Sequence, residues 1–228
     1  MNIQDTHNLI LLIVNKEQNA YLSHEDIDLV LDRAQLTLFN QYHTNPKLPP
    51  NAQGFIYGNN QTIDDALSPF KYKYTFTTSS NGIVTLPSDY MHLISVYTTV
   101  YNSTLARNVY SAVQVMNEEE LIQRLESQVV PVTSDDPIGI MNYQNKIQLF
   151  PEAVSSGGVY YFRRPLTPKF AYTQSGRTIT YDSNNSQDLE WRDSDVMNIV
   201  SIALSYYGLN MSSQDVQQFA ELKTQQGT

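Results

Sequence analysis

The side chains that could perform chemistry are dispersed along the sequence. The histidines are His7, His24, His43 and His92, and no two of them have the H-x-x-x-H spacing that places metal ligands on one helix face. No serine stands in a G-x-S-x-G turn, no glycine-rich stretch matches a phosphate-binding loop, and there is no cysteine for a thiolate or a disulfide. We therefore expect the histidines to be exposed residues at helix ends and turns.

Carboxylates are the other candidates for catalysis. Asp64-Asp65, Asp135-Asp136 and Glu118-Glu119-Glu120 are acidic clusters, but glycoside hydrolysis needs two carboxylates that face each other across a sugar, ~5–9 Å apart. Neighbours in sequence do not supply that geometry, so we interpret the clusters as solvated turns and a helix N-terminus. Asp182 and Asp188 resemble a calcium loop only faintly, because the stretch lacks the central glycine and terminal glutamate of an EF-hand. The sequence predicts no catalytic residue, no metal ligand and no cofactor.

Tyrosine is unusually abundant, with sixteen residues beside a single tryptophan. One interpretation is an aromatic platform for a sugar or for stacked bases, formed by Tyr97, Tyr101 and Tyr110 and by Tyr160 with Tyr161. The interpretation that we favour is that alternate members fill the core of a sheet, while the others contact neighbouring subunits.

Composition excludes several classes of protein. The chain has 228 residues and a net charge of −9, which suits one large domain or two small ones. Its hydrophobic content of 41% argues against a disordered chain. The longest apolar run, Leu9–Val14, is too short for a membrane span, which needs ~20 residues. The acidic balance argues against a protein that wraps nucleic acid, although DNA could still slide past such a surface.

The sequence predicts two helices at the N-terminal end of the chain, within residues 1–44. Thr6 is expected to cap a helix over residues 7–16, and Ser23 to cap a second one with Asp26 at the capping-box position. The second helix carries one apolar stripe, formed by Ile27, Leu31, Ala34 and Leu38. Residues 1–44 are therefore predicted to form an N-terminal helical hairpin.

Residues 45–71 are predicted to form an extended arm, because prolines and glycines interrupt any long element there. Phe55, Ile56 and Tyr57 form an apolar cluster inside this polar segment, and we predict that they contact a partner chain.

Residues 72–188 are predicted to form a β-rich domain, in which Asn117 caps a short helix over Glu118–Glu126. The expected strands cover residues 72–77, 82–86, 93–101, 109–115, 138–143, 146–150 and 159–163. Residues 176–188 are interpreted as a linker. Residues 189–228 are assigned two C-terminal helices, at about 193–207 and from 212 or 213 to about 223. The predicted fold is α+β: a helical bundle from the N- and C-terminal helices with an inserted antiparallel β-sandwich or barrel-like domain.

Four stretches of the chain stand out together because of their order. The first is Val14–Ser23 with Ala34–Leu36, and the second is Leu86–Tyr90 before Leu93-Ile94. The third is Asn145–Pro151 with Val159–Pro165, and the fourth is Leu189–Trp191. In this order they resemble the N-terminal helical hairpin, the strand entry, the following hairpin and strand, and the C-terminal helical return of the head–tail connector (adaptor) proteins of tailed phages, including crAss-like phages.

The resemblance implies a structural virion protein without enzymatic activity, made in the cytoplasm of a bacterial host. Such proteins form a ring, usually a dodecamer, below the portal protein and beside other neck or tail rings. Genomic DNA passes through the ring without sequence-specific binding, and no membrane is involved. An acidic lumen would repel the phosphates of DNA, and Glu118, Glu119 and Glu120 are the candidates that line it.

Two other functions stay open. One is a glycan-binding tail or surface module that uses the tyrosines as its platform. The other is a hydrolase whose carboxylate pair is distant in sequence, such as Asp89 with Glu152 or with Glu190.

Overall fold

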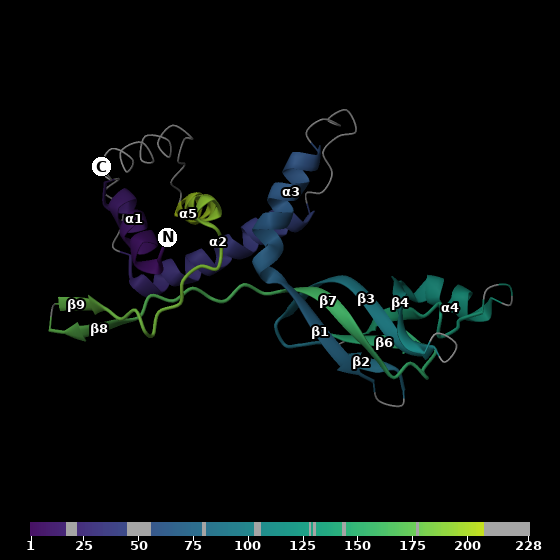
Figure 1. The fold of residues 1–228 in the computed structure, drawn as a ribbon. Helices are drawn as coiled ribbons and strands as arrows, with labels where there is room; N and C mark the ends of the chain where they lie inside the picture. Colours follow the sequence, from purple (N-terminus) through teal and green to yellow (C-terminus); the bar gives the residue numbers. More distant parts are fainter. Residues whose placement is uncertain are drawn as a thin grey trace. The chain divides into compact units, whose positions relative to one another are not determined.

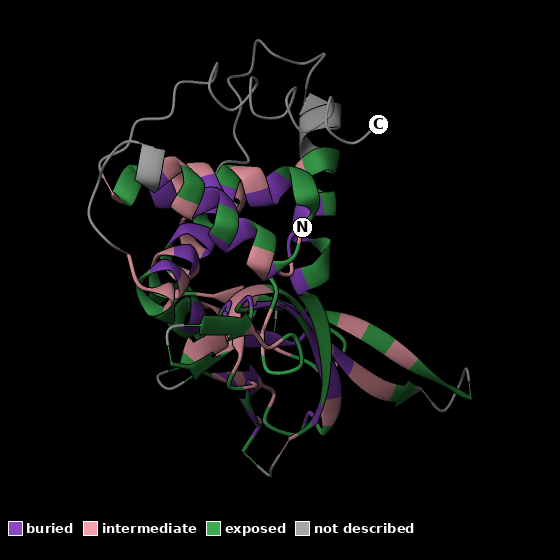
Figure 2. Cartoon of the chain, turned by 90° about the vertical axis from the view of Figure 1, so that its left-hand side faces the viewer, coloured by how far each residue is buried: buried purple, intermediate pink, exposed green. Residues whose placement is uncertain are grey.

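The computed structural model describes residues 1–16, 22–44, 56–78, 81–102, 106–127, 129, 131–142, 145–176 and 178–207. The chain divides into two compact units (Figure 1). Unit 1 comprises Met1–Pro69 and Pro165–Thr228, and unit 2 comprises Phe70–Arg164. Both units contain buried residues (Figure 2).

Unit 1 contains four α-helices within its described residues, and one of them contacts the other three. The central helix is α2 (His24–Thr44), and its neighbours are α1 (Ile3–Lys16), α3 (Ile56–Leu67) and α5 (Asp193–Tyr206). The predicted apolar stripe of α2 is confirmed, because all four of its residues are buried. Burial of this stripe against three neighbours supplies the stabilisation that an isolated helix lacks.

The two predicted helix caps have different outcomes. The cap at Ser23 is confirmed: its hydroxyl accepts from the backbone N–H of Asp26 at 3.1 Å, and Asp26 accepts from the N–H of Ser23 at 3.4 Å. The cap at Thr6 is wrong, because Asn2 accepts from the N–H of Asp5 at 2.7 Å and α1 begins at Ile3. Thr6 is instead buried inside the helix, and its hydroxyl donates to the carbonyl of Asn2 at 2.9 Å.

Unit 2 is a single curved sheet of seven strands in the order β1-β7-β3-β4-β5-β6-β2. Its elements are β1 (Lys71–Thr77), β2 (Ile83–Thr85), β3 (Tyr90–Asn102), β4 (Arg107–Met116), α4 (Glu118–Glu126), β5 (Ile138–Asn142), β6 (Lys146–Phe150) and β7 (Ser156–Arg163). A short 3-10 helix, Ser68–Phe70, precedes β1. All seven strands expected from the sequence are present, with ends that differ by a few residues.

The pairing of β4 with β5 is parallel, whereas the other neighbours in the sheet are antiparallel. A parallel pair cannot be joined by a tight turn, so the chain must cross over between the two strands. Helix α4 lies in that crossover and contacts β5.

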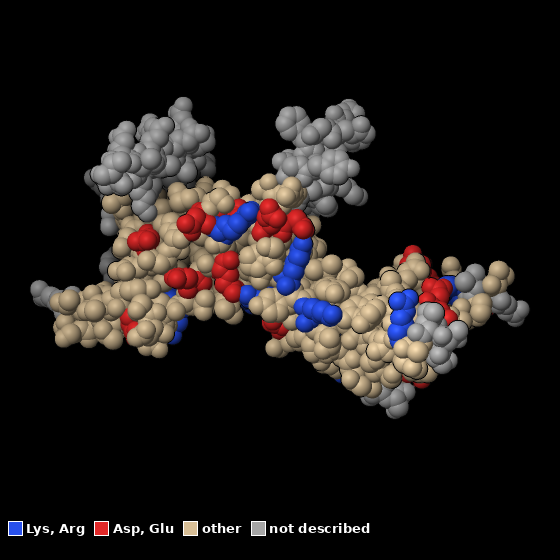
Figure 3. All heavy atoms as spheres, viewed as in Figure 1, with Lys and Arg blue, Asp and Glu red and all other residues tan. Residues whose placement is uncertain are grey.

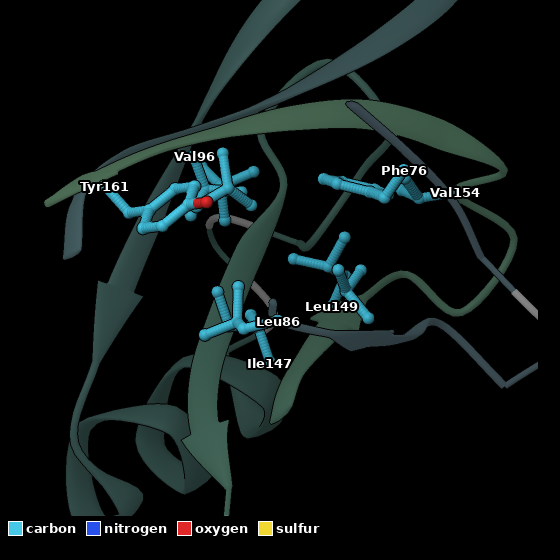
Figure 4. Packing of buried hydrophobic residues seen from close by; sticks show 10 residues of the cluster. Phe76, Leu86, Val96, Ile147, Leu149, Val154 and Tyr161 are labelled. Carbon is cyan, nitrogen blue, oxygen red and sulfur yellow. The ribbon is translucent and has the colours of Figure 1, made fainter. Parts of the chain in front are cut away.

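The core of unit 2 lies on one face of the curved sheet and comes from strands that are distant in sequence. Phe76, Val96, Leu149 and Tyr161 are among its members, as shown in Figure 4. Side chains alternate between the two faces of a strand, so the neighbours of these residues lie on the opposite, outer face.

The predicted fold is wrong. The structure is not a bundle of N- and C-terminal helices with an inserted antiparallel β-sandwich or barrel-like domain. Helices α3 and α4 come from the interior of the chain, and unit 2 has one mixed sheet rather than two facing antiparallel sheets. The described chain is α+β, with five α-helices, a nearly closed seven-stranded mixed sheet and a small two-stranded sheet. The prediction failed because the parallel pairing and its crossover are not encoded in local patterns.

Two segments predicted to lack regular structure also contain it. Residues 56–67 of the expected arm form α3, and β8 (Tyr172–Ser175) pairs with β9 (Thr178–Tyr181) around the start of the expected linker. Residues 45–55 and the second C-terminal helix predicted within 212–223 lie outside the described residues. None of the described helices is long and apolar enough to cross a membrane.

Candidate functional site

The most distinctive surface of unit 2 is a group of three tyrosines and one lysine on the outer face of the sheet; Tyr97 is half-buried and the other three side chains are exposed. Its members are Lys73, Tyr97, Tyr110 and Tyr160, which we call the tyrosine face. Lys73 pairs directly with Tyr160 across β1 and β7. Tyr97 pairs with Gly158 across β3 and β7, which places its ring on the same side as Tyr160, two residues further along β7.

The strand alternation separates this surface from the core. Tyr161 is only 4% exposed and belongs to the core, whereas Tyr160 is 39% exposed and points outward. The prediction that alternate tyrosines fill the core is therefore confirmed for this pair. Tyr110 is 69% exposed, and Tyr101 is also exposed further along β3.

The aromatic rings of the tyrosine face contact one another. The ring of Tyr97 lies 5.8 Å from that of Tyr160 at an interplanar angle of 40°, and 5.6 Å from that of Tyr110 at 73°. These separations are those of tilted and edge-to-face aromatic pairs. Because the planes of the rings differ, they do not form one flat platform on which a sugar ring could stack.

Lys73 gives this surface its positive charge. Its Nζ lies 5.3 Å from the ring centre of Tyr97 and 5.6 Å from that of Tyr160, which is within cation–π range. A hydrogen bond to the side chain of Tyr97 is the main cause that raises the pKa of Lys73, with an electrostatic contribution from Tyr160. The lysine is therefore charged at neutral pH and held between two rings by contacts within its own unit.

Gly158 in β7 allows the ring of Tyr97 to lie close to the sheet. A Cβ atom at Gly158 would be 2.4 Å from Tyr97 Oη and 2.5 Å from its Cζ, which is closer than real side chains approach. The absence of a side chain at residue 158 thus leaves room for the central ring of the tyrosine face.

The acidic residues predicted for a channel lining begin α4. Asn117 caps this helix as predicted: its side chain accepts from the N–H of Glu120 at 2.8 Å, and Glu120 accepts from the N–H of Asn117 at 3.4 Å. Glu118, Glu119 and Glu120 are all exposed. Their placement in a channel stays a prediction.

A hollow of about 360 Å³ adjoins the start of α4. Its lining combines one carboxylate with apolar and amide side chains: Glu118, Leu121, Ile140, Met141, Asn142 and Gln148. The hollow is therefore mainly a place for an apolar or aromatic group, with a negative charge at one side.

The partner contacts predicted for Phe55, Ile56 and Tyr57 stay a prediction. Phe55 lies outside the described residues, and Ile56 and Tyr57 form the first turn of α3.

The carboxylates proposed for a hydrolase have structural partners. Asp89 accepts a hydrogen bond from the hydroxyl of Tyr161 at 3.1 Å, and its backbone carbonyl accepts from the N–H of Arg164. Glu190, in unit 1, accepts from the N–H of Leu166 at 2.9 Å. Glu152 is exposed in the turn after β6. These contacts connect neighbouring segments and give no support to a catalytic pair.

The expectation that the histidines are exposed is wrong: His7 is fully buried, and His24, His43 and His92 are half-buried, with His92 inside β3 rather than at a helix end or turn. The Nε2 atom of His7 lies 2.9 Å from a carboxylate oxygen of Asp28, and its Nδ1 lies 3.1 Å from Nδ1 of His24. The ring of Phe170 stacks on both imidazoles at 4.7 and 4.3 Å, and its backbone N–H donates to Asp28. Sequence reasoning missed this cluster because the two histidines are seventeen residues apart and share no motif.

Asp182 and Asp188, which faintly resemble part of a calcium loop, accept hydrogen bonds from the protein itself. Asp182 accepts from the N–H of Asn184 at 3.1 Å and from the side-chain amide of Asn185 at 2.6 Å, which lowers the pKa of Asp182. Asp188 accepts from the N–H of Ile3 at 2.7 Å. Within the described residues, no group of three or more metal-ligating side chains comes together.

No known protein-family model matches the chain, and a search of curated proteins finds no significant match.

Proposed function

We propose that this chain is a structural virion protein, a ring-forming connector that joins the head of a tailed phage to its tail below the portal. The tyrosine face is the observation that carries the proposal. Tyrosine is enriched at protein interfaces, because a rigid ring buries a large area while its hydroxyl keeps a polar partner. A subunit of a ring needs such a surface toward its neighbour.

The chemistry of the described residues agrees with a structural role. The buried His7 and the carboxylates of Asp89 and Glu190 are engaged in contacts that hold segments of their own units together. The net charge of −9 suits a channel that DNA traverses without binding, because like charges repel.

A glycan-binding module is the second candidate, and the exposure of Tyr110 and Tyr160 is the observation in its favour. The angles between the rings favour the connector, because a sugar stacks on a flat aromatic surface. Specific binding on a glycan array that is lost in Tyr110→Ala and Tyr160→Ala would favour the glycan-binding module instead.

Electron microscopy of the purified chain tests the connector. The expected result is a set of closed rings with rotational symmetry and a central channel. Particles that contain a single copy of the chain at every concentration would contradict the proposal.

A further inference from the structure

We infer that the tyrosine face of one copy docks onto the start of α4 in the next copy of the chain. The inference rests on the proposed ring, because this contact would be the one that repeats around it. The occupant of the tyrosine face is thus a second copy of this chain.

The two surfaces have opposite charge. Lys73 is exposed, and none of the described carboxylates forms an ion pair with it. Glu118 and Glu119 are exposed, and no cation in the described part of unit 2 pairs with them. On the side of unit 2 seen in Figure 3, basic side chains lie near the start of β1, and both acidic and basic side chains lie around α4. Such complementarity steers association and sets its register.

The two surfaces also have complementary shape. The tyrosine face presents Tyr110, which is 69% exposed, as a projecting ring. The hollow beside α4 offers Leu121 and Met141 as apolar walls, with Glu118 at its side. A tyrosine ring in this hollow would bury its apolar body and leave its hydroxyl near the carboxylate, which is the arrangement that tyrosine favours at interfaces.

These surfaces cannot meet within one chain. Tyr110 lies near the start of β4, and α4 follows its last residue, Met116, so the two are about 20 Å apart along the strand. A contact between different surfaces of identical subunits is heterologous, and it closes into a ring when its rotation allows.

The edge strand of the sheet, β1, favours docking of a second copy through side chains over pairing with a strand of that copy. β1 is a terminal strand of the sheet, and Lys71 and Lys73 both project from it. Lysines on an edge strand discourage uncontrolled pairing with another strand, while leaving the outer face available.

Variants that reverse the charge on one surface or the other test this contact. The variants are Lys73→Glu and the double variant Glu118→Lys/Glu119→Lys, with sedimentation velocity over a concentration series as the measurement. Each variant alone should weaken self-association by about tenfold or more, because like charges then face each other. An equimolar mixture of the two should associate as the wild type does, because every contact in an alternating ring again joins opposite charges.

Matched controls make the same kinds of charge reversal at residues outside the proposed contact. Lys169→Glu alters an exposed lysine of unit 1, and Glu126→Lys alters the far end of α4. Both should associate as the wild type does.

The outcomes separate the two proposals. If the wild type forms rings and the charge variants associate equally well, the docking contact is wrong and the connector stands. Variants that stay weak after mixing would likewise overturn the contact. A wild-type chain that never self-associates would overturn both.

Discussion

The ring of Tyr97 lies against Gly158, its direct partner across β3 and β7, so closely that a Cβ at that glycine would be 2.4 Å from the phenol oxygen. The space left at Gly158 is occupied by the ring that touches Lys73, Tyr110 and Tyr160. The tyrosine face therefore requires a residue without a side chain at position 158.

Gly158→Ala should displace the ring of Tyr97 and lower the free energy of unfolding by about 0.5–1.5 kcal/mol, the usual cost of moving a side chain off its preferred rotamer. It should also weaken self-association. Chemical denaturation provides the measurement, and a double-mutant cycle with Tyr97→Ala provides the control. In the Tyr97→Ala background the cost of Gly158→Ala should largely disappear; a cost that persists in full would show that the ring is not what the methyl group meets.

Tyr161 should make stability depend on alkaline pH. Burial, together with its hydrogen bond to Asp89, raises the pKa of Tyr161 from 10.0 to about 12. The fold therefore favours the neutral phenol: its contribution is complete below pH 10 and is lost as pH rises through about 12. Tyr161→Phe should cost about 1 kcal/mol at pH 8, from loss of the hydrogen bond.

The measurement is urea denaturation of the wild type and Tyr161→Phe between pH 8 and pH 12. The advantage of the wild type over Tyr161→Phe should shrink above pH 10. An advantage that is constant with pH would contradict the assignment.

His24 should make the stability of unit 1 depend on acidic pH. Burial, and next the positive charge that His7 can carry, lower the pKa of His24 below 6.5, although Glu25 and Asp28 oppose the shift. The fold favours neutral His24, so its contribution is present above pH 6.5 and is lost as pH falls through the lowered pKa. The wild type should lose more stability between pH 7 and pH 5 than His24→Asn does. Equal losses in thermal unfolding would rule out His24 as the responsible group.

The capping box of α4 should be worth about 1 kcal/mol. Asn117→Ala removes the acceptor for the N–H of Glu120, so amide hydrogen exchange in the first turn of α4 should accelerate. Glu119→Gln is the matched control, because this exposed neighbour takes no part in the cap, and it should change stability by less than about 0.5 kcal/mol. Equal effects of the two substitutions would contradict the cap's contribution.

Local patterns predicted much of the secondary structure. The seven strands of unit 2, the stripe on α2 and the cap at Asn117 follow from alternation, helical spacing and capping chemistry, which act over a few residues. Helix α3 was missed because Gly58 and its neighbouring asparagines are weak helix formers. The β8–β9 hairpin does have a signal in the sequence: Gly176 follows Ser175 between two short runs rich in threonine and tyrosine. In the structure this glycine has a positive φ of 62°, as a tight turn requires.

Contacts between distant segments were not predictable in this way. The parallel pairing of β4 and β5 is set by where a crossover packs, and the His7–His24–Asp28 cluster forms only when two helices meet. The tyrosine face was partly predictable: alternation separates Tyr160 from Tyr161, but the register that brings Lys73 beside Tyr160 needed the structure.

Native mass spectrometry of the purified full chain, over a concentration series, tests the central claim most directly. The proposed connector predicts a closed oligomer of defined mass, near twelve subunits as the resemblance implies, with no open-ended series of larger species. A chain that remains monomeric over the whole series would contradict it.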